Sequence, residues 1–228
     1  MSAIDFLKKE IKSLSTFERI FFLSAITIII ITSILTKDNK LALLSSICGI
    51  CYTILAGKGK IYCYFIGMIG TFCYAYLSFK NAFYGNFALY FFYYLPMEII
   101  GIFKWKNHLK SNSTEIIKTS LSRKEKLVYS IATIITTTIF TYLLFLIGDK
   151  NPIIDAIATI FSITGMILTV KRCIEQWYIW IIVNALSLIM WLGAYLEGSN
   201  SIAIVFMWLT YLILGIYFFH QWKKELKK

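Results

Sequence analysis

Long apolar runs alternate with short polar segments along almost the whole chain. Each run has roughly the length of a membrane-spanning helix, because about 20 apolar residues, each rising about 1.5 Å, cross the hydrocarbon core of a bilayer. The runs cover residues 18–36, 41–56, 61–79, 84–104, 126–148, 153–170, 176–196 and 201–220. This pattern predicts an all-α integral membrane protein with about eight transmembrane helices.

The composition favours the same class of protein. The 228 residues are 58% hydrophobic and 15% charged, which is typical of integral membrane proteins. The net charge of +11 does not indicate a nucleic-acid partner, because the basic residues lie in short clusters between apolar runs. Cys48 and Cys51 form a C-x-x-C pattern without a second cysteine pair or a histidine cluster. We therefore expect neither a metal site nor a cofactor.

The positions of the basic residues predict the orientation of the chain. With eight spans, almost all of the 23 lysines and arginines fall on one side of the membrane. The exceptions are Lys37, Lys40, Lys80 and Lys150. Cytoplasmic loops carry an excess of lysine and arginine, so we expect both termini in the cytoplasm.

Two segments, 41–106 and 153–223, each hold three of the runs and share an order of features. In both, the first loop is short and basic, the next helix opens with an aromatic pair, and the third helix ends in Trp-Lys. The matching residues are Lys58 and Lys60 with Lys171 and Arg172, Tyr62 and Phe65 with Trp177 and Trp180, and Trp105-Lys106 with Trp222-Lys223. Run 126–148 separates the two triplets and gives them the same orientation, a 3+1+3 parallel-repeat plan found in transporters.

This plan divides the chain into five parts. They are an N-terminal cytoplasmic segment with an extra transmembrane helix (1–40), a first three-helix repeat (41–106), a cytoplasmic loop with a linker helix (107–150), a second three-helix repeat (151–223) and a basic cytoplasmic tail (224–228). The pattern assigns no role to the leading helix 18–36.

Polar and aromatic residues at mid-depth predict a substrate site. A carboxyl group such as Glu98 costs about 2.5–3.5 kcal/mol at the centre of a span, so it is a functional candidate by default. Phe91 and Tyr94 precede it by seven and four residues, on the same face of a regular helix. Further candidates at helical spacing are Trp180, Asn184, Ser187 and Trp191 in one span and Trp208 and Tyr211 in the last. Aromatic rings beside one carboxylate suit a flat ligand that is cationic or has a polar rim.

Structural roles would also account for several of these residues. Asn184 could form a hydrogen bond between helices, and Glu98 could be a protonated structural carboxyl group. Six aromatic residues lie near span ends, where an interfacial aromatic belt is expected: Tyr62, Tyr84, Trp105, Trp177, Tyr178 and Trp222. Pro96, close to Glu98, predicts a kink in its helix.

The stretches "WYIWIIVN" and "YGNFALYFFYYLPMEIIGIFKW", together with the 3+1+3 plan over residues 41–223, resemble the PnuC family of bacterial vitamin transporters. The resemblance implies a homotrimer in the bacterial inner membrane, with one nicotinamide riboside site in each protomer. It also implies facilitated diffusion, with trapping of the riboside through phosphorylation by a separate cytoplasmic kinase. No enzymatic activity is expected of the chain itself.

Other functions remain open at this point. Relatives with similar sites imply thiamine or riboflavin as alternative substrates, and the 3+1+3 plan also suits a sugar facilitator. Titration of Glu98 would allow coupling to protons or sodium. A membrane-embedded enzyme with Glu98 as its base would need a second catalytic group, which the mid-depth residues do not supply. A purely structural membrane subunit is the last alternative.

Overall fold

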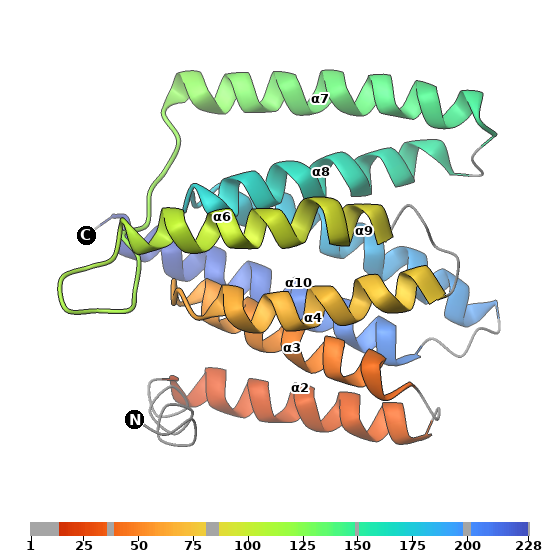
Figure 1. Ribbon diagram of the computed structural model, residues 1–228, viewed down its shortest axis with the longest axis horizontal. Helices are drawn as coiled ribbons and strands as arrows, with labels where there is room; N and C mark the ends of the chain where they lie inside the picture. The colour runs from red at the N-terminus through yellow and green to blue at the C-terminus, as the bar shows by residue number, and fades with distance from the viewer. Residues whose placement is uncertain (1–13, 36–38, 81–86, 149–150, 198–201, 228) are drawn as a thin grey trace.

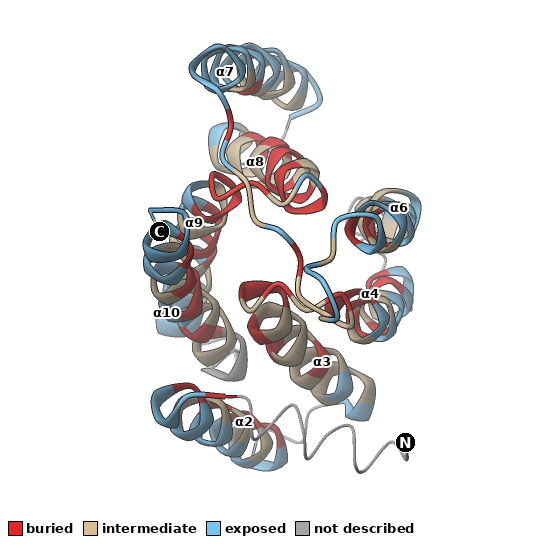
Figure 2. Ribbon diagram, turned by 90° about the vertical axis from the view of Figure 1, so that its left-hand side faces the viewer, coloured by how far each residue is buried: buried red, intermediate tan, exposed pale blue. Residues whose placement is uncertain are grey.

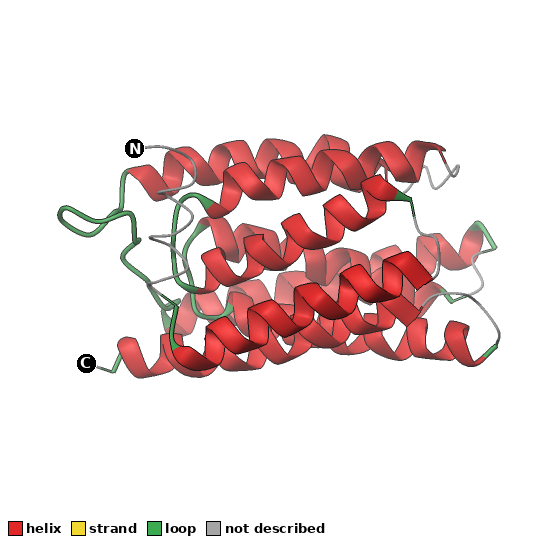
Figure 3. Ribbon diagram, turned by 90° about the horizontal axis from the view of Figure 1, so that it is seen from below, coloured by secondary structure: helices red, strands yellow, loops and turns green. Residues whose placement is uncertain are grey.

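The computed structural model describes residues 14–35, 39–80, 87–148, 151–197 and 202–227 (Figure 1). This part of the chain forms α-helices and no strand, which confirms the predicted all-α class (Figure 3). The helices are α2 (Thr16–Leu35), α3 (Lys40–Gly57), α4 (Cys63–Lys80), α6 (Leu95–Lys106), α7 (Arg123–Leu146), α8 (Pro152–Val170), α9 (Gln176–Leu196) and α10 (Ile202–Glu225). Six of the described helices, all except α4 and α6, are long and apolar enough to cross a membrane.

The run predicted at 84–104 is not one regular helix. Its first part is a π-helical segment, η1 (Leu89–Tyr94), which continues into α6. Pro96 has no N–H to donate to the carbonyl group four residues earlier, so a regular α-helical ladder is broken there. The Leu95 N–H bonds instead to the Tyr90 carbonyl oxygen, five residues earlier. The helical turn before Pro96 is therefore a wide, π-helical one.

Six helices form a closed ring in the order α3, α4, α6, α8, α9 and α10, each packing on the next (Figure 2). The third helix of each predicted triplet thus contacts the first helix of the other, α6 on α8 and α10 on α3. Outside the ring, α2 packs on α3 and α10, and α7 packs on α8.

Tryptophans bind the two triplets together at the end of the bundle where α6 and α10 finish. The Trp105 indole N–H donates to the Thr169 carbonyl oxygen at 3.1 Å, and the Trp222 indole N–H donates to the Gly57 carbonyl oxygen at 2.5 Å. Both side chains are fully buried, and Trp177 is 3% exposed. The prediction of an interfacial belt is wrong for these three tryptophans, because their side chains are buried between helices. Tyr178, by contrast, is 51% exposed, and Tyr84 lies outside the described residues.

We call this end of the bundle the basic end. It contains two tight turns, the first turn (residues 58–62, between α3 and α4) and the second turn (residues 171–175, between α8 and α9). The extended connector from α6 to α7 also lies here, with both described ends of the chain (Figure 3).

The helices outside the ring begin alike. In α7, Ser122 and Glu125 form a capping box, in which each side chain accepts a hydrogen bond from the other residue's backbone N–H. Ser15 and Glu18 make the same two bonds at the start of α2, at 2.7 and 3.2 Å. The sequences are "SLSTFER" and "SLSRKEK", a repetition that the sequence analysis missed. Both helix starts are thus fixed by the same local chemistry.

Candidate substrate site

Glu98 is a buried carboxylate inside the ring, with 4% of its surface exposed. Its Oε1 atom accepts a hydrogen bond of 2.9 Å from the Thr71 hydroxyl of α4, and its Oε2 atom has no hydrogen-bond partner among the described residues. The close approach depends on Gly67, because a Cβ atom there would lie 2.8 Å from Oε1. One carboxylate oxygen is therefore held in place and the other is free to accept a bond from a ligand.

Tyrosines form a wall next to Glu98. The Tyr74 ring of α4 lies 4.3 Å from the Tyr90 ring, and the Tyr90 and Tyr94 rings meet edge to face at 4.9 Å. Tyr94 also lies beside Ser162 of α8. The Tyr93 hydroxyl donates to the Ile163 carbonyl oxygen at 2.8 Å, which attaches η1 to α8.

Phe91 does not share this wall. Its side chain is 38% exposed and stacks on Phe87 at 5.4 Å, with Phe92 at 5.2 Å. The predicted shared face assumed 3.6 residues per turn between Phe91 and Glu98. The wide turn of η1 changes that register, so that Tyr90 joins Tyr94 and Phe91 lies among exposed side chains.

Helix α9 contributes Trp180, Asn184 and Ser187. The Trp180 indole N–H donates to the Thr169 hydroxyl at 3.0 Å, and its ring lies against Gly165 of α8. Asn184 and Ser187 are 6% and 8% exposed. Asn184 lies eight residues after the start of α9 and Glu98 eight residues before the end of α6, so both are about 12 Å from the basic end. Trp191, further along α9, is half-buried.

Helix α10 contributes Trp208 and Tyr211. The two rings meet edge to face at 5.7 Å, and the buried Trp208 indole N–H has no partner among the described residues. The Tyr211 hydroxyl lies against Gly49 of α3, where any Cβ atom would collide with it. Trp208 thus leaves an unpaired donor inside the protein, and Glu98 leaves an unpaired acceptor.

Comparisons with known proteins give the family. A family model described as "Nicotinamide mononucleotide transporter" matches residues 39–224. This chain belongs to that transporter family.

Relatives in this family are similar over most of their length. The chain is 31% identical to a Haemophilus influenzae protein named nicotinamide riboside transporter PnuC, over 85% of this chain and 83% of the relative. A Neisseria mucosa protein of the same name is 29% identical over 93% of this chain and 82% of the relative. The fold is similar to the crystal structure of the vitamin B3 transporter PnuC, with a TM-score of 0.85 and 27% identity over 100% of this chain and 99% of that one.

The charges in this member of the transporter family are unevenly distributed along the ring helices. In the described part of the ring, lysines and arginines occur only near helix ends, as with Lys40, Lys80 and Lys104. Glu98 is therefore a mid-depth carboxylate without a nearby basic residue in its own layer. A carboxyl group in such a position is a candidate for pairing with a polar or cationic ligand.

The sequence analysis missed several residues around Glu98. Thr71 holds the carboxylate, Tyr52 lies with Glu98 against Gly67, and Tyr74 and Tyr90 stack beside Tyr94. Tyrosines and threonines are too common in membrane helices to stand out individually. The glycines of α4 were the available signal, since Gly67 marks the place where a side chain from another helix comes close.

Proposed function

We propose that this protein imports nicotinamide riboside by facilitated diffusion. The main observation in support of this substrate is the Glu98 carboxyl group, which is buried, has no partner at Oε2 among the described residues and lies beside tyrosine rings. The pyridinium ring of the riboside is a flat cation that aromatic faces and a carboxylate both attract. Its ribose hydroxyls and its carboxamide can pair with the free carboxylate oxygen and the free indole N–H. Family membership and the names of the relatives support the same assignment.

The site favours the riboside over the mononucleotide, although the family description mentions the latter. A phosphate group requires arginine, lysine or several backbone N–H groups to replace its water shell. The basic residues of the described ring helices lie at the helix ends, away from the layer of Glu98 and Asn184. A phosphate group in that layer would therefore meet no basic side chain of the described ring helices.

The proposed site contains Glu98, Tyr94, Trp180, Asn184, Ser187, Trp191, Trp208 and Tyr211. Phe91 is left out of it because of its exposed position. We assign recognition of a ribose hydroxyl to Glu98 and of the carboxamide to Asn184.

The repeat gives a reason for one site per protomer. We take residues 41–106 and 151–223 as the two repeats, linked by 107–150, with 1–40 before them and 224–228 after them. Thr71 of α4 meets Glu98 of α6, and in the second triplet Asn184 of α9 faces Gly215 of α10, with 3.7 Å from its Nδ2 to the place of a Cβ atom. The carboxylate exists on one side only, so the two halves together build a single asymmetric site.

The basic end would face the cytoplasm of a bacterium, with both termini inside, in agreement with the excess of lysine and arginine. The protein would be a homotrimer without enzymatic activity. A separate kinase would trap the riboside by phosphorylation, because facilitated diffusion alone only equalises concentrations.

Equilibrium binding to the detergent-purified protein tests this function. We expect saturable binding of nicotinamide riboside, with weak or no binding of nicotinamide mononucleotide, thiamine, riboflavin or glucose. Glu98→Gln and Asn184→Ala should reduce the affinity by at least about tenfold, equivalent to about 1.4 kcal/mol. Phe91→Ala is the matched control, because Phe91 is an exposed aromatic residue of η1, the segment that continues into α6. The Phe91→Ala protein should bind the riboside normally. Tighter binding of the mononucleotide than of the riboside would reject the proposed substrate.

A further inference from the structure

The connector between α6 and α7 contacts both tight turns at the basic end. We call residues 113–121 the strap. At the first turn, the Ile116 N–H donates to the Gly59 carbonyl oxygen at 2.9 Å, and the Ile61 N–H donates to the Thr114 carbonyl oxygen at 3.2 Å. At the second turn, the Thr119 N–H donates to the Arg172 carbonyl oxygen and the Ile174 N–H to the Thr119 carbonyl oxygen, both at 2.9 Å.

The two turns have the same backbone conformation. Gly59 and Arg172 both have a positive φ, of 69° and 62°, and each follows a lysine that ends its helix. The strap therefore uses the same carbonyl position of each turn as its attachment point, once in each triplet. Ile116, which makes the first attachment, is completely buried.

The strap lies across the end of the helix ring. Figure 2 looks onto this end, and the connector runs from α6 across the front of the ring to α7. A substrate that leaves the ring at the basic end must pass the strap. The two turns also cannot separate while the strap holds both.

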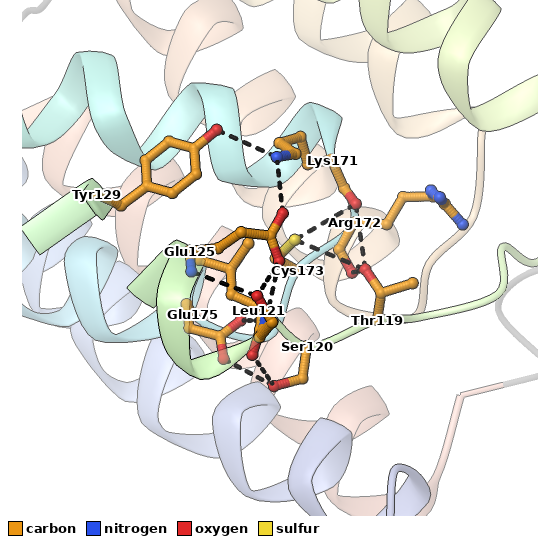
Figure 4. Close-up of polar contacts among 10 residues, drawn as sticks. Thr119, Ser120, Leu121, Glu125, Tyr129, Lys171, Arg172, Cys173 and Glu175 are labelled. Carbon is orange, nitrogen blue, oxygen red and sulfur yellow. Dashed lines mark hydrogen bonds and ion pairs between the residues drawn. The ribbon is translucent and has the colours of Figure 1, made fainter. Parts of the chain in front are cut away.

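The shortest side-chain bonds between the strap and a turn are those at the second attachment. Glu175 accepts hydrogen bonds from the Ser120 hydroxyl at 2.8 Å and the Leu121 N–H at 3.1 Å (Figure 4). It also pairs with Lys126 at 3.0 Å. The Arg172 guanidinium donates to the Ile117 carbonyl oxygen at 2.8 Å. At the first turn, the side-chain bonds of Lys60 to Glu115 and Thr114 are longer, at 3.3 Å each.

We propose that the strap is the cytoplasmic gate of the transporter, remaining attached to the second turn and releasing the first turn when the substrate leaves. This proposal rests on the proposed transport function. The strap moves with the second triplet, and the bonds of Gly59 and Ile61 to the strap break and reform in each transport cycle.

Two disulfides can distinguish the attachment that opens from the one that stays closed. Lys60 and Glu115 are bridge partners between flanking hydrogen bonds, a pair type with Cα atoms about 4.5 Å apart, so Lys60→Cys with Glu115→Cys can form a disulfide. At the second turn, the Thr119 hydroxyl lies 3.6 Å from the Cys173 sulfur, so Thr119→Cys alone can link to the native thiol. The second link is the matched control for the first.

The measurement is uptake of labelled nicotinamide riboside into proteoliposomes, after oxidation and again after reduction. The Lys60→Cys/Glu115→Cys protein should lose at least about nine-tenths of its uptake when oxidised and recover it when reduced. The Thr119→Cys protein and the unsubstituted protein should transport equally in both states. Recovery on reduction shows that the linked protein is folded.

The proposal would be overturned if the oxidised Lys60→Cys/Glu115→Cys protein, linked at the first turn, transported as fast as the same protein after reduction. A block by the link at the second turn would also overturn it, because the strap would then have to leave that turn too. If the unsubstituted protein carries no riboside, the proposed function fails and the gate fails with it. If it does carry riboside and the first link has no effect, only the gate fails.

Discussion

Glu98 and Gly67 face each other where α6 crosses α4, so closely that a Cβ atom on Gly67 would lie 2.8 Å from Oε1 of Glu98. The same atom would lie 2.7 Å from the Tyr52 ring. Gly67→Ala should therefore push the carboxylate away from Thr71 and reduce the riboside affinity by on the order of tenfold, about 1.4 kcal/mol. Equilibrium binding tests this. Gly193→Ala in α9 is the control, because nothing lies within 4 Å of its added methyl group; equal affinities of the two variants would contradict the prediction.

Thr71 holds Glu98 by a single hydrogen bond of 2.9 Å. Thr71→Val keeps the shape of the side chain and removes the donor, which leaves Oε1 without this bond in a buried position. We expect a loss of about 1–3 kcal/mol in stability and weaker riboside binding. Thermal unfolding in detergent and binding should both be measured. Thr138→Val in α7 is the control, since this exposed hydroxyl bonds only to the Ile134 carbonyl oxygen of its own helix at 3.0 Å.

Trp222 joins α10 to the end of α3 through its bond to the Gly57 carbonyl oxygen. Trp222→Phe removes the indole N–H from a fully buried position, and should lower the free energy of unfolding by about 1–3 kcal/mol. Trp105→Phe should behave alike, because Trp105 makes the corresponding bond to Thr169. Tyr178→Phe, at a side chain that is 51% exposed, should leave the melting temperature unchanged. A melting temperature that responds equally to all three changes would contradict this role.

The stabilisation of the strap by Glu175 should depend on pH. Burial alone would raise the pKa of this carboxyl group, but the Leu121 N–H, Lys126 and Ser120 stabilise its charged form more, and the net effect lowers the pKa below its ordinary value. A lowered pKa in the folded state means that the stabilisation is complete above the ordinary carboxyl pKa and is lost as the pH falls through the lower, folded value. The difference in melting temperature between the wild-type protein and Glu175→Gln should therefore be largest near neutral pH and shrink in acid.

The control for this pH prediction is Glu197→Gln, at an exposed carboxyl group beyond the end of α9. It should not change the melting temperature at either pH. A constant difference between wild type and Glu175→Gln from neutral to acidic pH would show that the charge of Glu175 does not hold the strap.

The helices could be predicted from the sequence because each is determined by its own residues. Hydropathy placed the run at 41–56, and the structure has Lys40–Gly57. The run at 176–196 coincides with α9, Gln176–Leu196. The family also followed from local stretches, since the residues around Glu98 and Asn184 were sufficient to recognise it.

Contacts between helices could not be predicted in the same way. The wide turn of η1 depends on one missing N–H at Pro96, and it moved Tyr90 beside Tyr94 in place of Phe91. Trp105 was expected at the membrane interface because its position near a span end is the only information the sequence gives. Its partner, the Thr169 carbonyl oxygen, belongs to a helix far along the chain. The bonds of the strap to Gly59, Ile61 and Ile174 join backbone groups, which leave no pattern in the sequence.

The capping boxes of α2 and α7 show that the leading helix α2 has a counterpart in α7. Glu18 of the first box pairs with Lys58 at 3.0 Å, and Glu125 of the second pairs with Lys171 at 3.6 Å. Each box thus forms an ion pair with the C-cap lysine of the next helix. Helix α2 thus stands to α3 as α7 stands to α8, and the chain consists of two consecutive quartets. Four crossings return a chain to the side from which it started. The two capping boxes accordingly lie at the same end of the bundle, and each quartet of helices begins there with the same local contacts.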